Sequence, residues 1–289
     1  MRRWFKIALQ AARAWISDNA FQHCAAVSFY TLFSLAPITL IAVGIAGFFL
    51  GKDAANREIT AQLTQLVGKE SAQMVQQTAL ASLSKAANWI STGVGIATLL
   101  VGATTVFAQL QQSLNQIWRV QANPRSSSLL FFVLHRLLSF AMVLTIGFLL
   151  LVSLIVTTAL SAMLGSFGGG GVPPGVAEAI DFIVALAVVA GLFALFFKVL
   201  PDVQLGWRDV WTGAFVTALL FGIGRFLIAL YLAHSTVASV YGAAGSLVAL
   251  LVWVYYSCAI LLYGVEFTRG TRLARGPALR PKKNAVMLP

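Results

Sequence analysis

Charged residues are scarce in this sequence. Lysine, arginine, aspartate and glutamate together make up 10% of the 289 residues, whereas hydrophobic residues make up 59%. A water-soluble domain covers its surface with helices and strands that alternate polar and apolar faces, and such alternation is missing over long stretches here. The composition therefore excludes an ordinary soluble domain.

Cysteine, histidine and the common catalytic motifs are also scarce or missing. The two cysteines, Cys24 and Cys258, lie inside or at the inner ends of apolar segments, so the sequence offers no external disulfide framework. The three histidines are far apart, and there is no His-x-Glu, Cys-x-x-Cys, Gly-x-Ser-x-Gly or phosphate-binding loop. We therefore expect no enzymatic activity, no catalytic residues, no metal and no cofactor.

Long hydrophobic runs are what the sequence has instead. The hydrocarbon core of a bilayer is about 30 Å thick, so a helix needs roughly 20 mostly apolar residues to cross it. Six runs meet this length: Cys24–Leu50, Trp89–Leu110, Leu137–Leu164, Val176–Leu200, Val210–Leu232 and Ala243–Glu266. The sequence therefore predicts an all-α polytopic membrane protein with six transmembrane helices.

The first two runs carry further expectations. The first is too long for the core of a cleavable signal peptide, and we expect it to remain as an uncleaved anchor. The second continues its apolar face as far as Ile117, and the Trp118-Arg119 pair should then anchor the helix at the membrane interface.

The basic residues predict the orientation of these helices. With six spans both termini lie on one side, where 15 lysines and arginines gather, while four lie on the opposite side. Basic residues favour the cytoplasmic side, so both termini should be cytoplasmic. The net charge of +11 also raises nucleic acid as a partner, but the excess lies beside span ends and no nucleic-acid-binding motif accompanies it. We expect contact with anionic lipid headgroups and no nucleic acid.

Three regions follow from this pattern. Residues 1–23 should form an interfacial amphipathic helix on the cytoplasmic surface, because a basic stripe lies opposite a tryptophan-containing one. Residues 24–266 form the six-helix domain, with an external helical hairpin at residues 51–88, and residues 267–289 form a basic cytoplasmic tail. The basic stripe holds Arg2, Lys6, Gln10 and Arg13, and the opposite stripe holds Trp4, Ala8, Ala11 and Trp15.

Pro37 lies midway along the first span. Proline removes a backbone donor and displaces the carbonyl four residues earlier, here that of Phe33, so we expect a kinked helix. The hydroxyls of Ser28, Thr31 and Ser34 are near enough in sequence to satisfy the freed groups. The kink either shapes a cavity between helices or serves packing alone, and the sequence leaves both open.

Arg225 interrupts the outer half of the fifth span. Glu178 and Asp181 share one face of the fourth span at a matching depth, because they are three residues apart on a helix. An unpaired guanidinium in hydrocarbon is costly, so we expect a buried ion pair between Arg225 and Asp181, assisted by Glu178. The pair would serve as a substrate site or as a structural clamp. Snorkelling of Arg225 to the outer headgroups is the competing account.

A second pair is predicted at the inner side of the membrane. Glu266 ends the sixth span and Arg136 opens the third, so their depths match. The alternative is that both are solvated charges at the interface.

Four segments carry a family resemblance. They are Ala25–Pro37 (AAVSFYTLFSLAP), Leu114–Trp118 (LNQIW), Tyr241–Ser246 (YGAAGS) and Tyr263–Glu266 (YGVE). In this order and spacing they resemble the YihY/BrkB family of bacterial inner-membrane proteins. The family usually has Gly-Ala-Glu at the end of the last segment, where this chain has Gly-Val-Glu.

The resemblance implies a multi-pass protein of the bacterial inner membrane. Members of the family have been linked with envelope integrity, serum resistance and the movement of lipids or lipopolysaccharide precursors. The family has also been labelled ribonuclease BN, and we reject that label here. RNA cleavage would need clustered metal ligands or a soluble nuclease domain, and the sequence contains neither.

The function we expect is that of a transporter or flippase-like protein for a lipid or another amphipathic anionic molecule. Arg225 and Arg136 would contact the anionic headgroup, and Pro37 would shape the cavity. Without a nucleotide-binding motif, the energy would come from a gradient or from no source at all. The alternative is a non-transporting scaffold of an envelope complex. Membrane lipids are the expected partners, and a homo-oligomer is left open.

Overall fold

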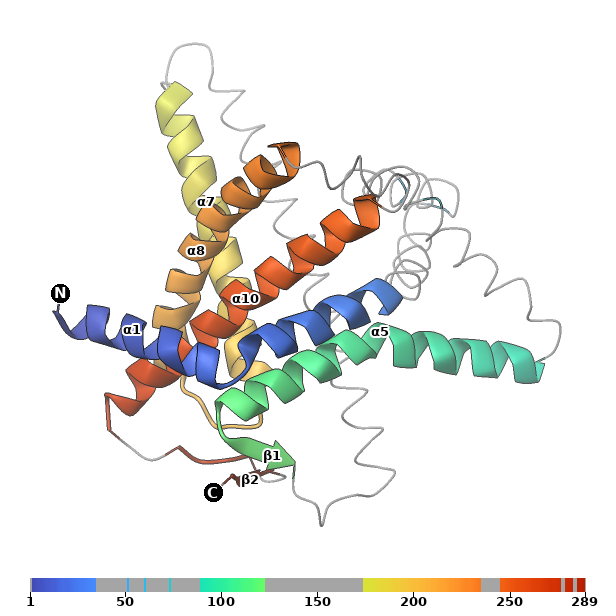
Figure 1. Cartoon of the computed structure of the whole chain (residues 1–289), viewed down its shortest axis with the longest axis horizontal. Coiled ribbons are helices and arrows are strands. Elements are labelled where there is room, and N and C mark those ends of the chain that lie inside the picture. Colours follow the sequence, from blue (N-terminus) through green and yellow to red (C-terminus); the bar gives the residue numbers. More distant parts are fainter. Residues whose placement is uncertain are drawn as a thin grey trace. The chain divides into compact units, whose positions relative to one another are not determined.

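The structure, a computed structural model, describes residues 2–34, 51, 60, 73, 89–122, 174–234, 245–276, 279–282 and 285–288. These residues are mostly helical (Figure 1). The helices are α1 (Arg2–Ser17), α5 (Trp89–Ile117), α7 (Pro174–Val199), α8 (Trp207–His234) and α10 (Gly245–Leu273), and residues 20–34 are helical as well. Two short strands, β1 (Val120–Ala122) and β2 (Ala285–Met287), pair in an antiparallel manner.

Two described segments are long and apolar enough to cross a membrane by length and composition. They are Phe182–Val199 in α7 and Leu247–Leu273 in α10, with mean hydropathies of 2.6 and 2.0. These segments lie in the predicted fourth and sixth spans, while α5 and α8 cover the second and fifth. The predicted third span lies outside the described residues, as does the external hairpin at residues 51–88 apart from single positions. The count of six and the orientation stay predictions.

The helix ends differ in detail from those expected. α5 continues to Ile117, as the apolar face of the second run predicted, and α10 runs past Glu266 to Leu273. The first residues of the predicted tail are therefore helical. At the N-terminus α1 stops at Ser17, and Asn19 adopts a positive φ of 55° before the chain turns into the next helix. Asparagine tolerates this left-handed conformation better than most residues, which suits it to the end of a helix.

The chain divides into two compact units, which are described separately. The terminal unit comprises Met1–Asp18, Gln111–Gly224 and Ile260–Pro289, and the central unit comprises Asn19–Leu110 and Arg225–Ala259. The terminal unit thus holds both chain ends, α7 and the strands, together with parts of α5, α8 and α10.

In the central unit, the helix at residues 20–34 contacts α5. The Ser34 hydroxyl donates a hydrogen bond to the Gly102 carbonyl at 2.6 Å. The hydroxyls of Ser28 and Thr31 donate to carbonyls four residues earlier in their own helix, at 2.8 Å each. All three hydroxyls therefore have partners other than the carbonyl that Pro37 would free. Pro37 itself lies outside the described residues, so the kink stays a prediction.

In the terminal unit, α1 packs against the last turns of α10. Ile7 and Ala11 form a buried cluster with Phe267. The Tyr263 hydroxyl donates to the backbone carbonyl of Ala8 at 3.3 Å. These contacts fix α1 to the protein by its small apolar side chains.

The packing of α1 changes which face is available to a membrane. Ala8 and Ala11 belong to the predicted membrane-facing stripe, but they contact α10 instead. Phe5, Leu9 and Ile16 lie on a different face of the helix, and all three are exposed. An interfacial position for α1 stays a prediction, and it would rest on this second face.

The C-terminal tail folds back onto the terminal unit. Two backbone hydrogen bonds, 2.8 and 2.9 Å long, join residues 202–204 to residues 280–282. Farther along the tail, β2 pairs with β1 so that Val120 lies opposite Met287. The tail is therefore part of the fold, and its pairing places Lys282 beside the loop between α7 and α8.

Helices α8 and α10 approach each other closely in the terminal unit. Gly213 of α8 faces Thr268 of α10, and Gly264 of α10 faces Thr217 of α8. A methyl group on Gly264 would overlap the Thr217 hydroxyl and would lie 2.9 Å from the Thr217 Cβ. Each threonine hydroxyl donates to the carbonyl of the glycine four residues earlier in its own helix, at 2.7 Å. Both helices thus use Gly-x-x-x-Thr, a small-residue pattern that lets helices in membranes approach closely.

Gly264→Ala should destabilise the protein by about 1–3 kcal/mol, because the added methyl group has no room at this crossing. The matched control is Gly222→Ala in α8, where a methyl group would meet no atom within 4 Å. The melting temperature of the purified protein in detergent measures the effect. Equal melting temperatures for the two variants would contradict the close approach of α8 and α10.

Candidate functional site

The loop between α7 and α8, residues 200–206, is held at its centre by the end of α5. The Asp202 carboxylate accepts a hydrogen bond from the Asn115 amide at 2.7 Å and longer ones from Gln111 at 3.3 Å. In return, the backbone N–H of Asp202 donates to the Asn115 side-chain oxygen at 2.7 Å. The neighbouring Val203 is fully buried. These contacts set the path of the loop from the end of α7 to the start of α8.

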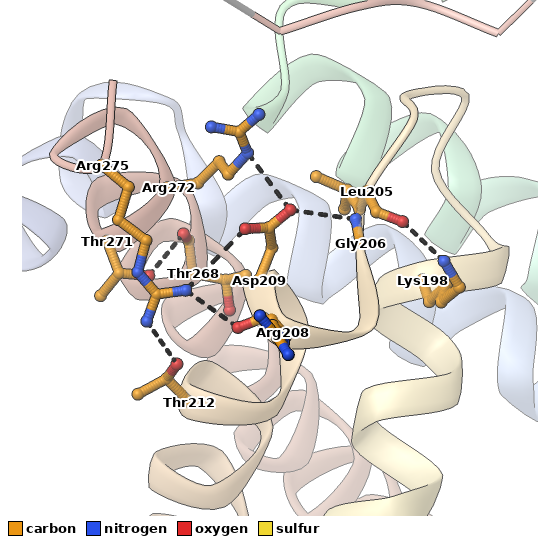
Figure 2. A network of polar contacts seen from close by, with 10 residues as sticks. All are labelled: Lys198, Leu205, Gly206, Arg208, Asp209, Thr212, Thr268, Thr271, Arg272 and Arg275. Atoms are coloured by element: carbon orange, nitrogen blue, oxygen red, sulfur yellow. Dashed lines mark hydrogen bonds and ion pairs between the residues drawn. The ribbon is translucent and has the colours of Figure 1, made fainter. Parts of the chain in front are cut away.

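Asp209 joins the first turn of α8 to the end of α10 (Figure 2). Its carboxylate accepts a hydrogen bond from the Gly206 N–H at 3.0 Å, which caps the start of α8. The same carboxylate pairs with Arg272 at 3.2 Å and with Arg275 at 3.8 Å. Arg275 also donates to the backbone carbonyl of Arg208 at 2.9 Å. The Asp209 carboxylate thus connects the start of α8, the loop that precedes it and the end of α10.

Two lysines line a cavity beside this loop. The Lys198 ammonium, in the last turn of α7, donates to the Leu205 carbonyl at 2.6 Å and lies 5.2 Å from the centre of the Trp207 ring. The Lys282 ammonium, from the tail, donates to the Val199 carbonyl at 2.9 Å. The cavity has a volume of about 590 Å³ and is lined by the two lysines, Val199 and residues 203–206.

The charges around this cavity favour an anion. Burial lowers the pKa of the Lys282 ammonium; the Asp202 carboxylate opposes this shift, and the positive charge of Lys198 adds to it. Two ammonium groups beside one partly buried cavity favour a ligand of opposite charge. As for metals, no three His, Cys, Asp or Glu side chains gather into a metal site within the described ranges.

A second polar cluster lies where α1, α5 and α10 meet. Asp18, 5% exposed, pairs with Arg119 at 2.6 Å, and Glu266, 2% exposed, pairs with Arg269 at 3.7 Å. The two carboxyl groups are close neighbours. The second oxygen of each, Asp18 Oδ2 and Glu266 Oε1, is buried without a donor among the described residues.

Glu266 is the predicted site residue whose side chain the structure describes. Its burial excludes the interpretation of Glu266 as a solvated charge at the interface. Its described neighbours are Arg269 and Asp18. Arg136 lies outside the described residues, so a pair between Glu266 and Arg136 stays a prediction.

The other predicted residues are placed by their backbones alone. Glu178 and Asp181 lie in α7, and Arg225 lies in α8, as expected for the fourth and fifth spans. Their side chains fall outside the described part of the structure. The ion pair between them stays a prediction, and so does the choice between a substrate site, a clamp and snorkelling.

Sequence reasoning missed the roles of Asp18, Asp202 and Asp209. Two signals were available. The chain has only nine acidic residues against 20 basic ones, and a buried carboxylate requires a partner. In addition, Gly206 three residues before Asp209 is a pattern typical of a capped helix start. No local signal pointed to the lysine cavity, because Lys198 and Lys282 meet only through the pairing of the tail.

Comparison with known proteins places these features in a family. A family model described as virulence factor BrkB matches residues 11–287. This chain belongs to the BrkB family. Its curated relatives include three membrane proteins named UPF0761. The protein from Verminephrobacter eiseniae is 28% identical over 87% of this chain and 58% of its own length, and that from Rhodospirillum centenum is 30% identical over 89% of this chain and 55% of its own length. The protein from Pseudoalteromonas translucida is 26% identical over 88% of this chain and 81% of its own length. The chain thus spans a little over half the length of several relatives. No solved structure matches it.

The structure gives physical roles to two of the segments through which this BrkB-family chain was recognised. In YGVE, Tyr263 contacts α1, and Gly264 has no side chain and so allows α8 to approach closely. Glu266 of the same segment lies beside the buried Asp18. In LNQIW, Asn115 holds the loop between α7 and α8. Trp118 is fully buried in the protein, so the prediction that it anchors α5 at the membrane interface is wrong.

Asp209→Ala should lower the stability by about 1–2 kcal/mol, because it removes the cap of α8 and the carboxylate that Arg272 and Arg275 share. Asp209→Asn keeps a side-chain oxygen for the Gly206 N–H and should lose less. Arg208→Ala, at an exposed neighbouring position, is the control. Melting temperatures in detergent compare the three variants. A loss for Asp209→Ala no larger than that for Arg208→Ala would show that the Asp209 network contributes nothing to stability.

Proposed function

We propose that this membrane protein is a transporter or flippase-like protein for a lipid or another amphipathic anionic molecule. The observation that supports the proposal is an exposed apolar stripe on α8 that begins beside a cation. Its members follow at intervals of four residues and are Trp207, Trp211, Phe215, Leu219 and Ile223. Lys198 lies over the ring of Trp207, the first of them. A surface that joins exposed hydrocarbon to positive charge suits an amphipathic anion.

The proposal places the protein in the bacterial inner membrane with both termini in the cytoplasm. The excess of basic residues beside the termini supports this orientation. The proposal includes membrane lipids as partners and includes no enzymatic activity, no cofactor and no nucleic acid. Under this proposal, transport is driven by a gradient or proceeds without an energy source.

A non-transporting scaffold is the second candidate. The close crossing of α8 and α10 favours it, because helices locked by glycine and threonine at van der Waals distance resist the rearrangement that transport requires. A transport measurement separates the two candidates.

The topology can be tested by fusion. A reporter enzyme that is active only outside the cytoplasm should stay inactive when it is fused after Pro289. The same reporter should be active when it is inserted within residues 51–88, because the basic residues orient that segment outward. Activity of the C-terminal fusion would contradict the proposed orientation.

Transport can be tested in liposomes that contain a fluorescent phosphatidylglycerol and the purified protein. A membrane-impermeant reductant added outside bleaches only the outer leaflet unless lipids cross. A transporter should let the bleaching proceed into the inner-leaflet pool, whereas a scaffold should give the same signal as liposomes that hold an unrelated membrane protein. Bleaching limited to the outer leaflet, both with and without an imposed transmembrane gradient, would reject the transport proposal for phosphatidylglycerol.

A further inference from the structure

We propose that the cavity between Lys198 and Lys282 binds the phosphate group of an anionic phospholipid, whose acyl chains lie along the apolar stripe of α8. This inference rests on the proposed function in one respect, since it names the substrate class and the place where the headgroup is held. The binding itself can be measured without transport.

The two ammonium groups are positioned before any ligand arrives. Lys198 and Lys282 are each tied by one hydrogen bond to a backbone carbonyl, at 2.6 and 2.9 Å. An ammonium group has three N–H donors, so these bonds orient each group and leave donors for a ligand. Lys282 owes its place to the tail, whose backbone is hydrogen-bonded to the loop between α7 and α8.

The acids nearest to the cavity have partners of their own. Asp202 accepts from Asn115 and Gln111, and Asp209 accepts from the Gly206 N–H and pairs with Arg272. Asp209 is paired with arginines, whereas Asp202 has uncharged amide partners, so its carboxylate offsets part of the positive charge of the lysines. Burial lowers the pKa of Lys282, the Asp202 carboxylate opposes this shift, and the positive charge of Lys198 adds to it. A phosphate between the lysines would favour the ammonium form of both.

The surroundings of the cavity favour a lipid phosphate over a free one. Trp207 is half-exposed and lies against Lys198, and Trp211 and Phe215 continue the exposed stripe away from the cavity. Tryptophan is enriched at the headgroup level of membranes, and basic pockets at this level bind anionic headgroups. The cavity is open to the surface, and its volume of about 590 Å³ is larger than a bare phosphate ion needs.

The test is calorimetric titration of the full chain, in an uncharged maltoside detergent, with three probes: short-chain phosphatidylglycerol, short-chain phosphatidylcholine and inorganic phosphate. Phosphatidylglycerol should bind more tightly than either of the others. Phosphatidylcholine carries its own cation near the lysines, and inorganic phosphate lacks acyl chains. Lys198→Gln and Lys282→Gln should each weaken phosphatidylglycerol binding about tenfold. The single variants Lys6→Gln and Arg208→Gln are the charge-matched controls, because both positions are exposed and lie outside the cavity.

Two further variants separate the parts of the site. Lys198→Arg/Lys282→Arg keeps both charges, so it should retain most of the affinity. The melting temperatures of the glutamine variants show whether a loss of binding is a loss of folding. Trp211→Ala should weaken phosphatidylglycerol but leave inorganic phosphate unchanged. Inorganic phosphate binding as tightly as phosphatidylglycerol would overturn the lipid assignment. Unchanged phosphatidylglycerol affinity in both glutamine variants would overturn the site.

The two proposals can fail separately. If phosphatidylglycerol binding depends on the lysines but liposomes show no lipid crossing, the proposed function fails and the site stands. If lipid crosses in liposomes and its binding ignores the lysines, the site fails and the function stands.

Discussion

The contact of α8 with α10 sets the geometry of the terminal unit. The two helices run antiparallel in a single register in which each step of four residues up α8 matches four residues down α10. Thr217 meets Gly264, Gly213 meets Thr268, and one turn farther Asp209 meets Arg272. Residues four apart lie on one face of a helix, so the same face that packs in the apolar part carries the ion pair at its end. Apolar surface gives little net attraction between helices in lipid, so close packing through small residues must supply it.

This register explains why the polar contacts gather at one end of the unit. The start of α8 is brought to the end of α10, and Gly206 then leads the chain back through the loop toward α7. The tail leaves α10 at the same end and pairs with that loop and with β1. Lys282 therefore reaches the cavity because the helix before it ends beside Asp209. A change at Gly264, far from the cavity in sequence, would act on both lysines through this chain of contacts.

Hydropathy predicted the helices better than it predicted their partners. The length of an apolar run fixes whether a helix can cross the membrane, so both ends of α7 and α8 and the starts of α5 and α10 were found within a few residues, while α5 and α10 continue seven residues beyond the predicted spans. Depth alone does not say which way a side chain points around the helix. Glu266 was therefore placed at the correct end, but its described partners are Arg269 and Asp18. The paired Gly-x-x-x-Thr segments of α8 and α10 were readable in the sequence and would have predicted their contact.

The distribution of acids decides which cations are left for a ligand. At this end of the terminal unit, Asp18 is paired with Arg119, Glu266 with Arg269, and Asp209 with Arg272 and Arg275. The remaining acid there, Asp202, is held chiefly by amides. The arginines, whose planar groups suit carboxylates, thus take three of the four acids, and the two lysines are bound by backbone carbonyls instead. A carbonyl satisfies a hydrogen bond without neutralising a charge. The cavity between Lys198 and Lys282 therefore keeps a positive charge that Asp202 offsets only in part.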